Sequence, residues 1–336
     1  MKPKALSVAK FGETINEDAA IARPRLLAVS DGAGGGGLFA DEWSRYMVSK
    51  LPDSPVTTFG QLDGWLDGIW ELFYTTHEQK ARQLSPMHLS KFYDEGSFAT
   101  LAAIWLSDTG KSSWMAYGDS VVFCYSRATG LLQHSFSRLA DFNRAPYLVS
   151  CKDAIDEKGF SSGIFDTDDE SIQFVTSDAL AHYVLMMYEV SRRDEYAEEL
   201  QEAIGRQSKC SNYVRAALTL PCFDFGRTVV EKLMRCRSSY NLQTHLRSRY
   251  EMGLLALDDY SVAMAQSCIT RVVRPRPLTK QRTRKMNISF EGSIPRRKYS
   301  KRFASAANAT PTELISFLPN FFASFGRMNI KMIIGE

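Results

Sequence analysis

The chain has 336 residues, of which 44% are hydrophobic and 24% are charged, which is the composition of an ordinary soluble globular protein. The first 12 residues lack the apolar core of a secretory signal, and no apolar stretch approaches the roughly 20 residues that span a bilayer. The six cysteines form no CxxC pair and no zinc-ligand spacing with the histidines. We therefore expect a cytoplasmic protein with reduced, mostly buried thiols and no transmembrane segment.

The net charge of +3 hides an asymmetry along the chain. Residues 269–336 carry 14 Lys/Arg against 3 Asp/Glu, which leaves 27 basic and 35 acidic residues in positions 1–268. We therefore expect an acidic domain over 1–268 and a flexible basic extension over 269–336. Three interpretations of the extension stay open: a solvated arm, an electrostatic contact with nucleic acid or an anionic surface, or recruitment of an acidic or phosphorylated substrate.

The first third of the chain predicts two strands followed by two helices. Strands are expected over Ala5–Phe11 and Arg25–Val29, on either side of an acidic turn. After a run of glycines, apolar residues at helical spacing predict a helix over Leu38–Leu51 and a second helix over Phe59–Gln83.

A β-meander is expected next. Phe98–Leu106 and Ser113–Ser126 read as two strands joined by the hairpin turn Ser107–Gly110. Gly130 then turns the chain into a further strand over Leu131–Ser137.

The last part of the domain predicts helices enclosed by two strands. A short strand, Ile172–Thr176, leads into a helix that begins near Ala179. Several helices are expected between about residues 190 and 250, with a break at Leu220–Cys222, before a final strand over Tyr260–Ala265. Strands, then helices, then a returning strand favour an α+β fold.

Five acidic residues, far apart in sequence, each lie where a predicted strand ends or meets a helix: Glu17, Asp31, Asp119, Asp178 and Asp258. The most informative is Asp31, because the apolar run before it stops at the segment Ser30–Gly37, which contains five glycines. Carboxylates gathered at one edge of a fold are the ligands that hard divalent cations require. The pattern therefore predicts a metal-dependent hydrolase.

The chemistry of such a site follows from its oxygen donors. Mg²⁺ and Mn²⁺ prefer oxygen ligands, and two ions about 3.5–4 Å apart need a bridging carboxylate and lower the pKa of bound water. Asp31 is placed to bridge, the carbonyl of Gly32 is free to add an oxygen, and the glycines allow close approach. No histidine or cysteine falls in these turns, which counts against zinc.

The order of these segments is similar to that of the metal-dependent protein phosphatase 2C family over residues 1–268. The stretch near 190–250 is atypical of that family. Each motif alone is weak, and the ordered set is specific. The matching segments are Asn16-Glu17-Asp18-Ala19, Val29-Ser30-Asp31-Gly32-Ala33-Gly34-Gly35, Gly96-Ser97-Phe98-Ala99-Thr100, Tyr117-Gly118-Asp119-Ser120, Thr176-Ser177-Asp178-Ala179-Leu180 and Asp258-Asp259-Tyr260-Ser261-Val262.

The resemblance implies a set of ligands for two Mn²⁺ or Mg²⁺ ions. The first ion would be held by Glu17, Asp31 and the Gly32 carbonyl, and the second by Asp31, Asp178 and Asp258. It further implies that Asp31 and Asp178 act in catalysis, in which a water that bridges the metals attacks phosphorus directly, without a phosphoenzyme.

The resemblance also implies a third, weaker ion near Asp119, while Asp18 and Asp259 would orient ligands or bound water. The expected fold is a central β-sandwich of two antiparallel sheets flanked by helices. The expected substrate is a protein that carries phosphoserine or phosphothreonine.

Two positions depart from the family pattern. Glu13 stands where the family has an arginine that grips the substrate phosphate, so we expect Lys10 to replace it, ahead of Arg23 or Arg25. Ala33 stands where eukaryotic members have a histidine that donates a proton, and this loss indicates a bacterial-type member.

Simpler interpretations of single residues stay open. Asp178 is also suited to capping the helix that follows it, and Asp119 to an ordinary hairpin turn. At the level of function, the alternatives are a catalytically silent relative that binds protein or metal, which Glu13 and Ala33 suggest, and a nucleic-acid-associated factor that uses the basic extension.

Overall fold

The computed structural model describes residues 2–205, 208 and 210–267, and all statements about structure concern these residues. Their strands form two five-stranded antiparallel sheets and one small pair. Sheet A has the order β1-β12-β11-β7-β8, with the bounds Lys4–Val8, Tyr260–Gln266, Ser171–Thr176, Val121–Ser126 and Leu132–His134. Sheet B has the order β10-β6-β5-β3-β2, with the bounds Phe160–Asp166, Lys111–Tyr117, Leu101–Trp105, Leu26–Ser30 and Ala19–Arg23. The small pair joins β4 (Phe98–Ala99) to β9 (Val149–Ser150).

The two sheets pack face to face, because alternate side chains of their strands form a common apolar layer. In β5, Ala102 and Ile104 belong to the layer between the sheets, together with Val175 and Ala263 of sheet A. The neighbouring residues of β5 point the other way, toward the helices outside sheet B, and Leu101 is among them. The central strands are thus buried on both faces, which requires the continuous apolar runs seen in the sequence.

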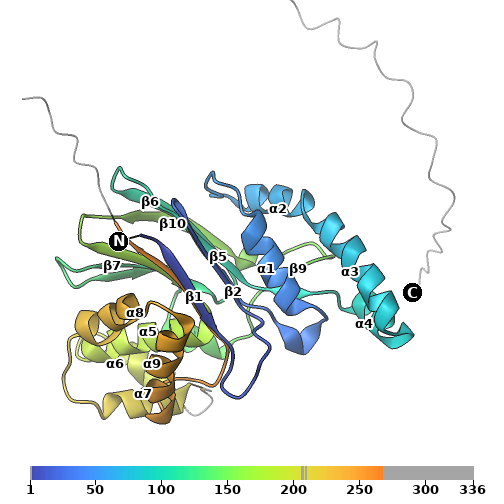
Figure 1. Cartoon of the computed structure of the whole chain (residues 1–336). Helices are drawn as coiled ribbons and strands as arrows, with labels where there is room; N and C mark the ends of the chain where they lie inside the picture. The colour runs from blue at the N-terminus through green and yellow to red at the C-terminus, as the bar shows by residue number, and fades with distance from the viewer. Residues whose placement is uncertain (1, 206–207, 209, 268–336) are drawn as a thin grey trace, which may run out of the picture. The chain divides into compact units, whose positions relative to one another are not determined.

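Helices cover the outer face of each sheet (Figure 1). Helix α1 packs directly on sheet B, and α2 to α4 share its apolar core; the bounds of the four helices are Ala40–Lys50, Phe59–Asp67, Trp70–Leu84 and Pro86–Asp94. Helices α5 to α9 pack on sheet A, with the bounds Asp178–Ser191, Ala197–Ala203, Ser211–Leu218, Glu231–Arg235 and Ser239–Glu251. The short helical turns are Gly34–Gly36, Leu139–Asn143, Glu157–Gly159 and Gly226–Val230. The expected α+β class, with a sandwich of antiparallel sheets flanked by helices, is confirmed.

Three expected elements are each divided in the structure. The strand predicted over Phe98–Leu106 is wrong as one element, because β4 pairs with β9 whereas β5 belongs to sheet B. The helix predicted over Phe59–Gln83 is two helices, because the chain turns at Gly68 before α3 begins. The strand predicted over Ser113–Ser126 is also wrong as one element, since Gly118 adopts a φ of +92° and ends β6 before β7 begins. These two strands belong to different sheets, so the turn between them carries the chain from sheet B to sheet A.

The helices between residues 190 and 250 are an integral part of the layer on sheet A. Their apolar residues share one core with α5 and with the outer face of the sheet, and Leu200, Val214 and Leu242 are buried there. The predicted break is confirmed, because no helix covers Leu220–Cys222.

The remaining expectations concern thiols, membranes and the extension. Among the described cysteines, Cys124, Cys151 and Cys236 are buried and all are free thiols, as expected. None of the helices in the described part of the chain combines the length and apolar character that crossing a bilayer demands. The predicted flexible extension over 269–336 lies outside the described residues.

Candidate functional site

The register of sheet A brings four of the predicted segments to one end of the sheet. Val8 pairs with Tyr260, and Thr176 pairs with both Val262 and Val121. The residues just beyond these pairs therefore lie at the same edge, and they are Lys10 after β1, Asp119 before β7, Asp178 after β11, and Asp258 and Asp259 before β12.

Sheet B contributes the other acidic residues at the same end. Ala19 pairs with Ser30, so Glu17 and Asp18, which precede β2, lie beside Asp31, which follows β3. The backbone of Asp31 is fixed by Thr100, whose amide donates to the Asp31 carbonyl at 2.8 Å. The Asp31 amide in turn donates to the Thr100 hydroxyl at 3.2 Å.

The carboxylate of Asp259 connects the two sheets at this edge. It accepts the backbone amide of Lys10 at 2.7 Å and the backbone amide of Glu17 at 2.6 Å. Charge-assisted hydrogen bonds of this length are among the stronger ones in proteins. Asp259 therefore positions the turn that carries Glu17. We call the whole group the acidic rim, and it consists of Glu17, Asp18, Asp31, Asp119, Asp178, Asp258 and Asp259.

The carboxyl groups of the acidic rim are close enough to repel one another. Burial raises the pKa of Asp31 well above its ordinary value, and the charges of Asp18, Asp178, Asp119 and Asp258 raise it further. Asp31, Asp119 and Asp178 nevertheless keep part of their surface accessible, as is expected of groups that a solute must reach. The charges of four residues from different segments of the chain thus raise the pKa of one carboxyl group.

The other two groups at the strand ends show the same effect. Burial, followed by the charge of Asp258, raises the pKa of Asp178 to about 6. Burial, followed by the charge of Asp178, raises the pKa of Asp119 to about 7. Burial also raises the pKa of Asp258, while the nearby charge of Lys10 acts in the opposite direction.

Asp18 is the most deeply buried member of the acidic rim. Its side chain is 3% exposed, and neither carboxylate oxygen has a hydrogen-bond partner within normal distance. Burial raises its pKa to about 8, with the nearby Ser177 and Ser261 hydroxyls acting against the rise and the charges of Asp178 and Asp259 adding to it. A buried carboxylate without a donor is costly unless a cation or a proton neutralises it.

Glycines leave just enough room for Glu17. A Cβ on Gly34 would lie 1.9 Å from Oε1 of Glu17, and a Cβ on Gly32 would lie 2.6 Å from the Glu17 carbonyl oxygen. The backbone of Gly34 also donates a hydrogen bond to the Glu17 carboxylate, which opposes the increase in pKa that burial causes. The glycine run is therefore needed for close packing around Glu17, as the sequence predicted.

The structure separates the three cations that were considered for binding phosphate. Lys10 lies at the acidic rim, where its charge acts on Asp258. Arg23 lies at the opposite end of sheet B and donates to the carbonyls of Leu51 and Ser49. Arg25 is also at that end and forms a 2.8 Å ion pair with Asp108. Of the three, only Lys10 is placed to act at the acidic rim.

The two simpler interpretations fare differently. Asp119 does not lie in a hairpin turn, because β6 and β7 belong to different sheets and the residue follows Gly118 at the crossing between them. Asp178 is the first residue of α5, with Ser177 in the capping position, and its carboxylate accepts the amide of Ala179. A local role at the start of the helix therefore coexists with its place in the acidic rim.

Sequence reasoning missed charged residues beside the Glu17 turn. Asp41, in the first turn of α1, acts on the Glu17 carboxyl, and Arg45 pairs with Asp41 at 2.6 Å. Arg45 also donates to the carbonyl of Asn16 at 2.7 Å. The spacing of four between Asp41 and Arg45 on a predicted helix was the available signal.

The donor set fits a hard divalent cation, although the side chains do not already form a cage. The acidic rim offers only oxygen atoms, several of them partly accessible, and Asp18 provides unpartnered buried oxygens. Within residues 2–267, apart from the gaps noted above, no group of three or more Asp, Glu, His or Cys side chains is positioned to hold a metal ion as it stands. The ligand assignments of Glu17, Asp31, Gly32, Asp119, Asp178 and Asp258 therefore stay predictions.

No protein-family model matches this chain, and neither does any curated protein. Several solved structures are similar to it. The Mycobacterium tuberculosis serine/threonine phosphatase PstP is 16% identical, with 79% of this chain and 98% of that chain covered and a TM-score of 0.45. The PstP catalytic domain in complex with two manganese ions is 14% identical, with 79% and 97% covered and a TM-score of 0.45. The serine/threonine phosphatase Stp1 from Staphylococcus aureus is 13% identical, with 79% and 94% covered and a TM-score of 0.42.

Proposed function

We propose that this protein is a metal-dependent serine/threonine phosphoprotein phosphatase whose active site is the acidic rim. The observation that carries the proposal is the convergence on Asp31 of the charges of Asp18, Asp119, Asp178 and Asp258. These residues come from separate segments and meet where the ends of two sheets come together. Carboxylates that raise one another's pKa values at a solvent-accessible edge are typical of functional sites, since a fold gains no stability from them.

In this proposal the acidic rim holds two Mn²⁺ or Mg²⁺ ions, with Asp31 shared between them. Glu17 and the Gly32 carbonyl complete one set of ligands, Asp178 and Asp258 complete the other, and Asp119 contributes to a weaker third ion, as the family resemblance implies. When bound, such ions polarise a phosphate ester and lower the pKa of water, which gives a nucleophile at neutral pH.

The chain's own residues position the reacting groups. Asp259 fixes the backbone at Lys10 and at Glu17 through its two short hydrogen bonds. The Lys10 ammonium, which already acts on Asp258, is the group that would pair with the substrate phosphate in place of the family's arginine. Asp18 is close enough to Asp178 and Asp259 for their charges to raise its pKa, and its unpartnered oxygens are suited to accepting hydrogen bonds from bound water.

The experiment measures phosphate release from a phosphothreonine peptide and from an aryl phosphate in the presence of Mn²⁺. We expect turnover that EDTA abolishes and that Asp31→Asn and Asp178→Asn each lower by at least about 100-fold. Asp166→Asn is the matched control, because Asp166 is exposed at the far end of β10, where it forms a 3.4 Å ion pair with Lys111. Full activity in both rim variants would exclude the assignment.

A catalytically silent relative is the second candidate. It is favoured by Glu13, which is exposed where the family has its arginine, and by the absence of a ready metal cage in the described residues. Calorimetric titration of Mn²⁺ distinguishes the two functions. Binding that Asp31→Asn abolishes, without turnover of any phosphopeptide, would favour the silent relative.

Contact of the extension with nucleic acid stays a separate prediction, tested by salt-dependent DNA binding before and after deletion of residues 270–336.

A further inference from the structure

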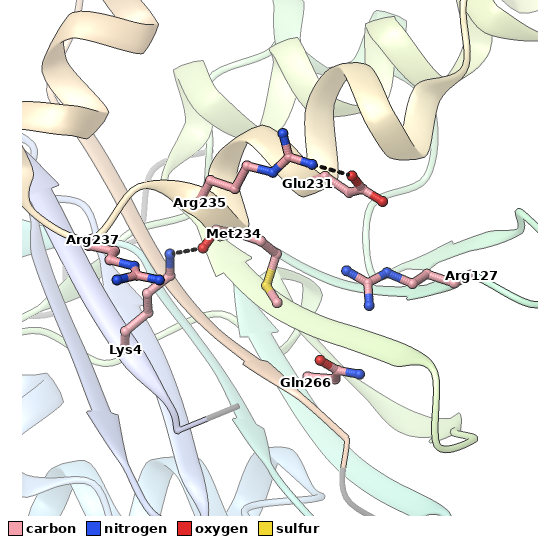
Figure 2. A pocket seen from close by; sticks show the side chains of 7 residues that line it. All are labelled: Lys4, Arg127, Glu231, Met234, Arg235, Arg237 and Gln266. Atoms are coloured by element: carbon pink, nitrogen blue, oxygen red, sulfur yellow. Dashed lines mark hydrogen bonds and ion pairs between the residues drawn. The ribbon is translucent and has the colours of Figure 1, made fainter.

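A cavity of about 630 Å³ lies at sheet A and is lined by seven residues (Figure 2). Its lining is rich in cationic side chains from three parts of the chain. We call it the basic pocket, and its charged residues are Lys4, Arg127, Glu231, Arg235 and Arg237. Met234 and Gln266 complete the lining.

The strand register places the basic pocket at the opposite end of sheet A from the acidic rim. Lys4 pairs with Met264, Ile172 pairs with Gln266, and Ser171 pairs with Ser126, the residue before Arg127. The strand β12 runs from the acidic rim at Tyr260 to the pocket at Gln266. At about 3.3 Å per residue, this separates the two sites by about 20 Å.

The charge of the pocket opposes that of the domain around it. Four of its side chains are basic and one is acidic, although residues 1–268 contain 27 basic and 35 acidic residues. Glu231 pairs with Arg235 at 3.0 Å. Among the described residues, neither Arg127 nor Arg237 has a carboxylate within ion-pair distance. Two guanidinium groups at this cavity are thus available to an anion.

Lys4 organises one wall of the pocket. Its ammonium donates to the carbonyls of Leu233 and Met234 at 3.0 Å and 2.8 Å, and also to that of Cys236. These carbonyls lie at the end of α8, so Lys4 fixes the point where the helix stops and Arg237 begins the next segment. Burial lowers the pKa of Lys4, which is consistent with its partial removal from water. Arg237 is therefore held on a defined backbone.

The cations stand on two sides of the cavity. Figure 2 shows Lys4 and Arg237 on one side and Arg127 on the other, with Met234 between them. In the sheet, β1 and β7 are separated by β12 and β11, so their backbones are about 14 Å apart at 4.8 Å per strand. Cations on two sides of one cavity are matched better by a ligand with two separated anionic groups than by a single small anion. The body of such a ligand must tolerate the Met234 side chain.

We propose that the basic pocket binds a small organic bisphosphate, with one phosphate at Arg127 and the other at Arg237. Guanidinium groups match phosphate oxygens in geometry and form paired, charge-assisted hydrogen bonds with them. The cavity volume lies within the roughly 300–1,000 Å³ of small-molecule sites. The Gln266 amide is placed to bond a hydroxyl on the body of the ligand. This inference does not rest on the proposed phosphatase function.

The experiment is calorimetric titration of the full-length protein, in EDTA, with fructose 1,6-bisphosphate, inorganic phosphate and a doubly phosphorylated peptide as probes. We expect fructose 1,6-bisphosphate to bind at least tenfold more tightly than inorganic phosphate. Arg127→Gln and Arg237→Gln should each weaken its binding at least tenfold. Glu231→Gln should tighten it severalfold, because it removes the single acidic group of the pocket.

Two variants separate the basic pocket from other anion sites on the same chain. Arg227→Gln is the matched control, because Arg227 is an exposed arginine in the turn just before α8 and does not line the cavity. Asp31→Asn tests whether the ligand binds at the acidic rim instead, and this variant should still bind fructose 1,6-bisphosphate. Both variants should therefore bind fructose 1,6-bisphosphate as the unmodified protein does.

Several results would overturn the proposal. One is the absence of binding at millimolar fructose 1,6-bisphosphate. Another is an equal loss of affinity in Arg227→Gln and Arg127→Gln, which would indicate unspecific attraction to surface charge. Loss of binding in Asp31→Asn would place the ligand at the acidic rim instead. Binding of the doubly phosphorylated peptide alone would replace the small molecule by a protein ligand.

Discussion

Replacement of Gly34 by alanine would move the Glu17 carboxylate without deleting it. The added Cβ would lie 1.9 Å from Oε1 of Glu17, whereas real Cβ contacts essentially never fall below 3.0 Å. The carboxylate must therefore move by about 1 Å or more, because the Glu17 side chain can rotate more easily than the backbone of the glycine run can shift. Gly35 is the matched control, since a Cβ there meets nothing within 4 Å.

The size of the effect follows from the geometry that metal ligands require. Mg²⁺ demands oxygen ligands at about 2.0–2.1 Å, and a misplacement of about 1 Å at a catalytic group costs on the order of 100-fold. We expect Gly34→Ala to weaken Mn²⁺ binding by roughly 10- to 100-fold, or about 1.4–2.8 kcal/mol, and to lower turnover to a similar degree. The metal-free protein should keep its stability, because the clash is with the end of a flexible side chain.

The assay is calorimetric titration of Mn²⁺ into the unmodified protein, Gly34→Ala and Gly35→Ala, with thermal unfolding of each in EDTA. Gly35→Ala should bind the metal as the unmodified protein does. Equal Mn²⁺ affinity and equal turnover in the two variants would show that Glu17 is not a ligand, and would refute the reasoning from the glycine cradle.

Two further predictions concern charges on other elements. Lys10→Met should lower kcat/KM for a phosphopeptide by about 10- to 100-fold. It should leave Mn²⁺ binding unchanged or tighter, since it removes a cation beside Asp258, and Lys111→Met at the far end of β6 should change neither quantity. Glu189 of α5 is 3% exposed, and burial raises its pKa to about 8 from the ordinary 4.5. The folded state therefore retains a proton that the unfolded chain releases, and stability falls as the pH rises from about 4.5 to about 8. One pKa unit corresponds to about 1.4 kcal/mol, so Glu189→Gln should raise the free energy of unfolding by up to about 5 kcal/mol at pH 9 and by little at pH 4.5. Urea unfolding of both proteins over this pH range measures the difference. Parallel pH profiles would contradict this cause.

The sequence predicted the α+β class because its strands have strong local signals, whereas the sandwich of two antiparallel sheets was implied by the family resemblance. Buried runs such as Leu26–Ser30 and Ser171–Thr176 end at polar turns, and an antiparallel sheet needs only such runs and their order. The divided elements show the limit of this approach. Periodicity continues through the turn at Gly68, so no local pattern marks that break. The pair Gly118-Asp119 is a turn signal, but the apolar residues on both sides of it favour one continuous strand.

The position of the acidic rim could be predicted, but its internal contacts could not. Each carboxylate follows or precedes a strand, which the sequence shows. The two hydrogen bonds that Asp259 accepts depend on how the turn around Glu17 folds over the edge of sheet A. The basic pocket left no sequence signal, because Lys4, Arg127 and Arg237 are separated by more than 100 residues and only the strand order joins them.

The central place of β12 in sheet A has a consequence for how the protein is made. This strand, Tyr260–Gln266, is among the last described segments to leave the ribosome. In sheet A it lies between β1, which is made first, and β11. Until it inserts, the nascent chain has an open slot in its sheet and lacks Asp258 and Asp259. Such long-range pairing slows folding. It also means that a chain interrupted before residue 258 would leave the ribosome without a complete acidic rim.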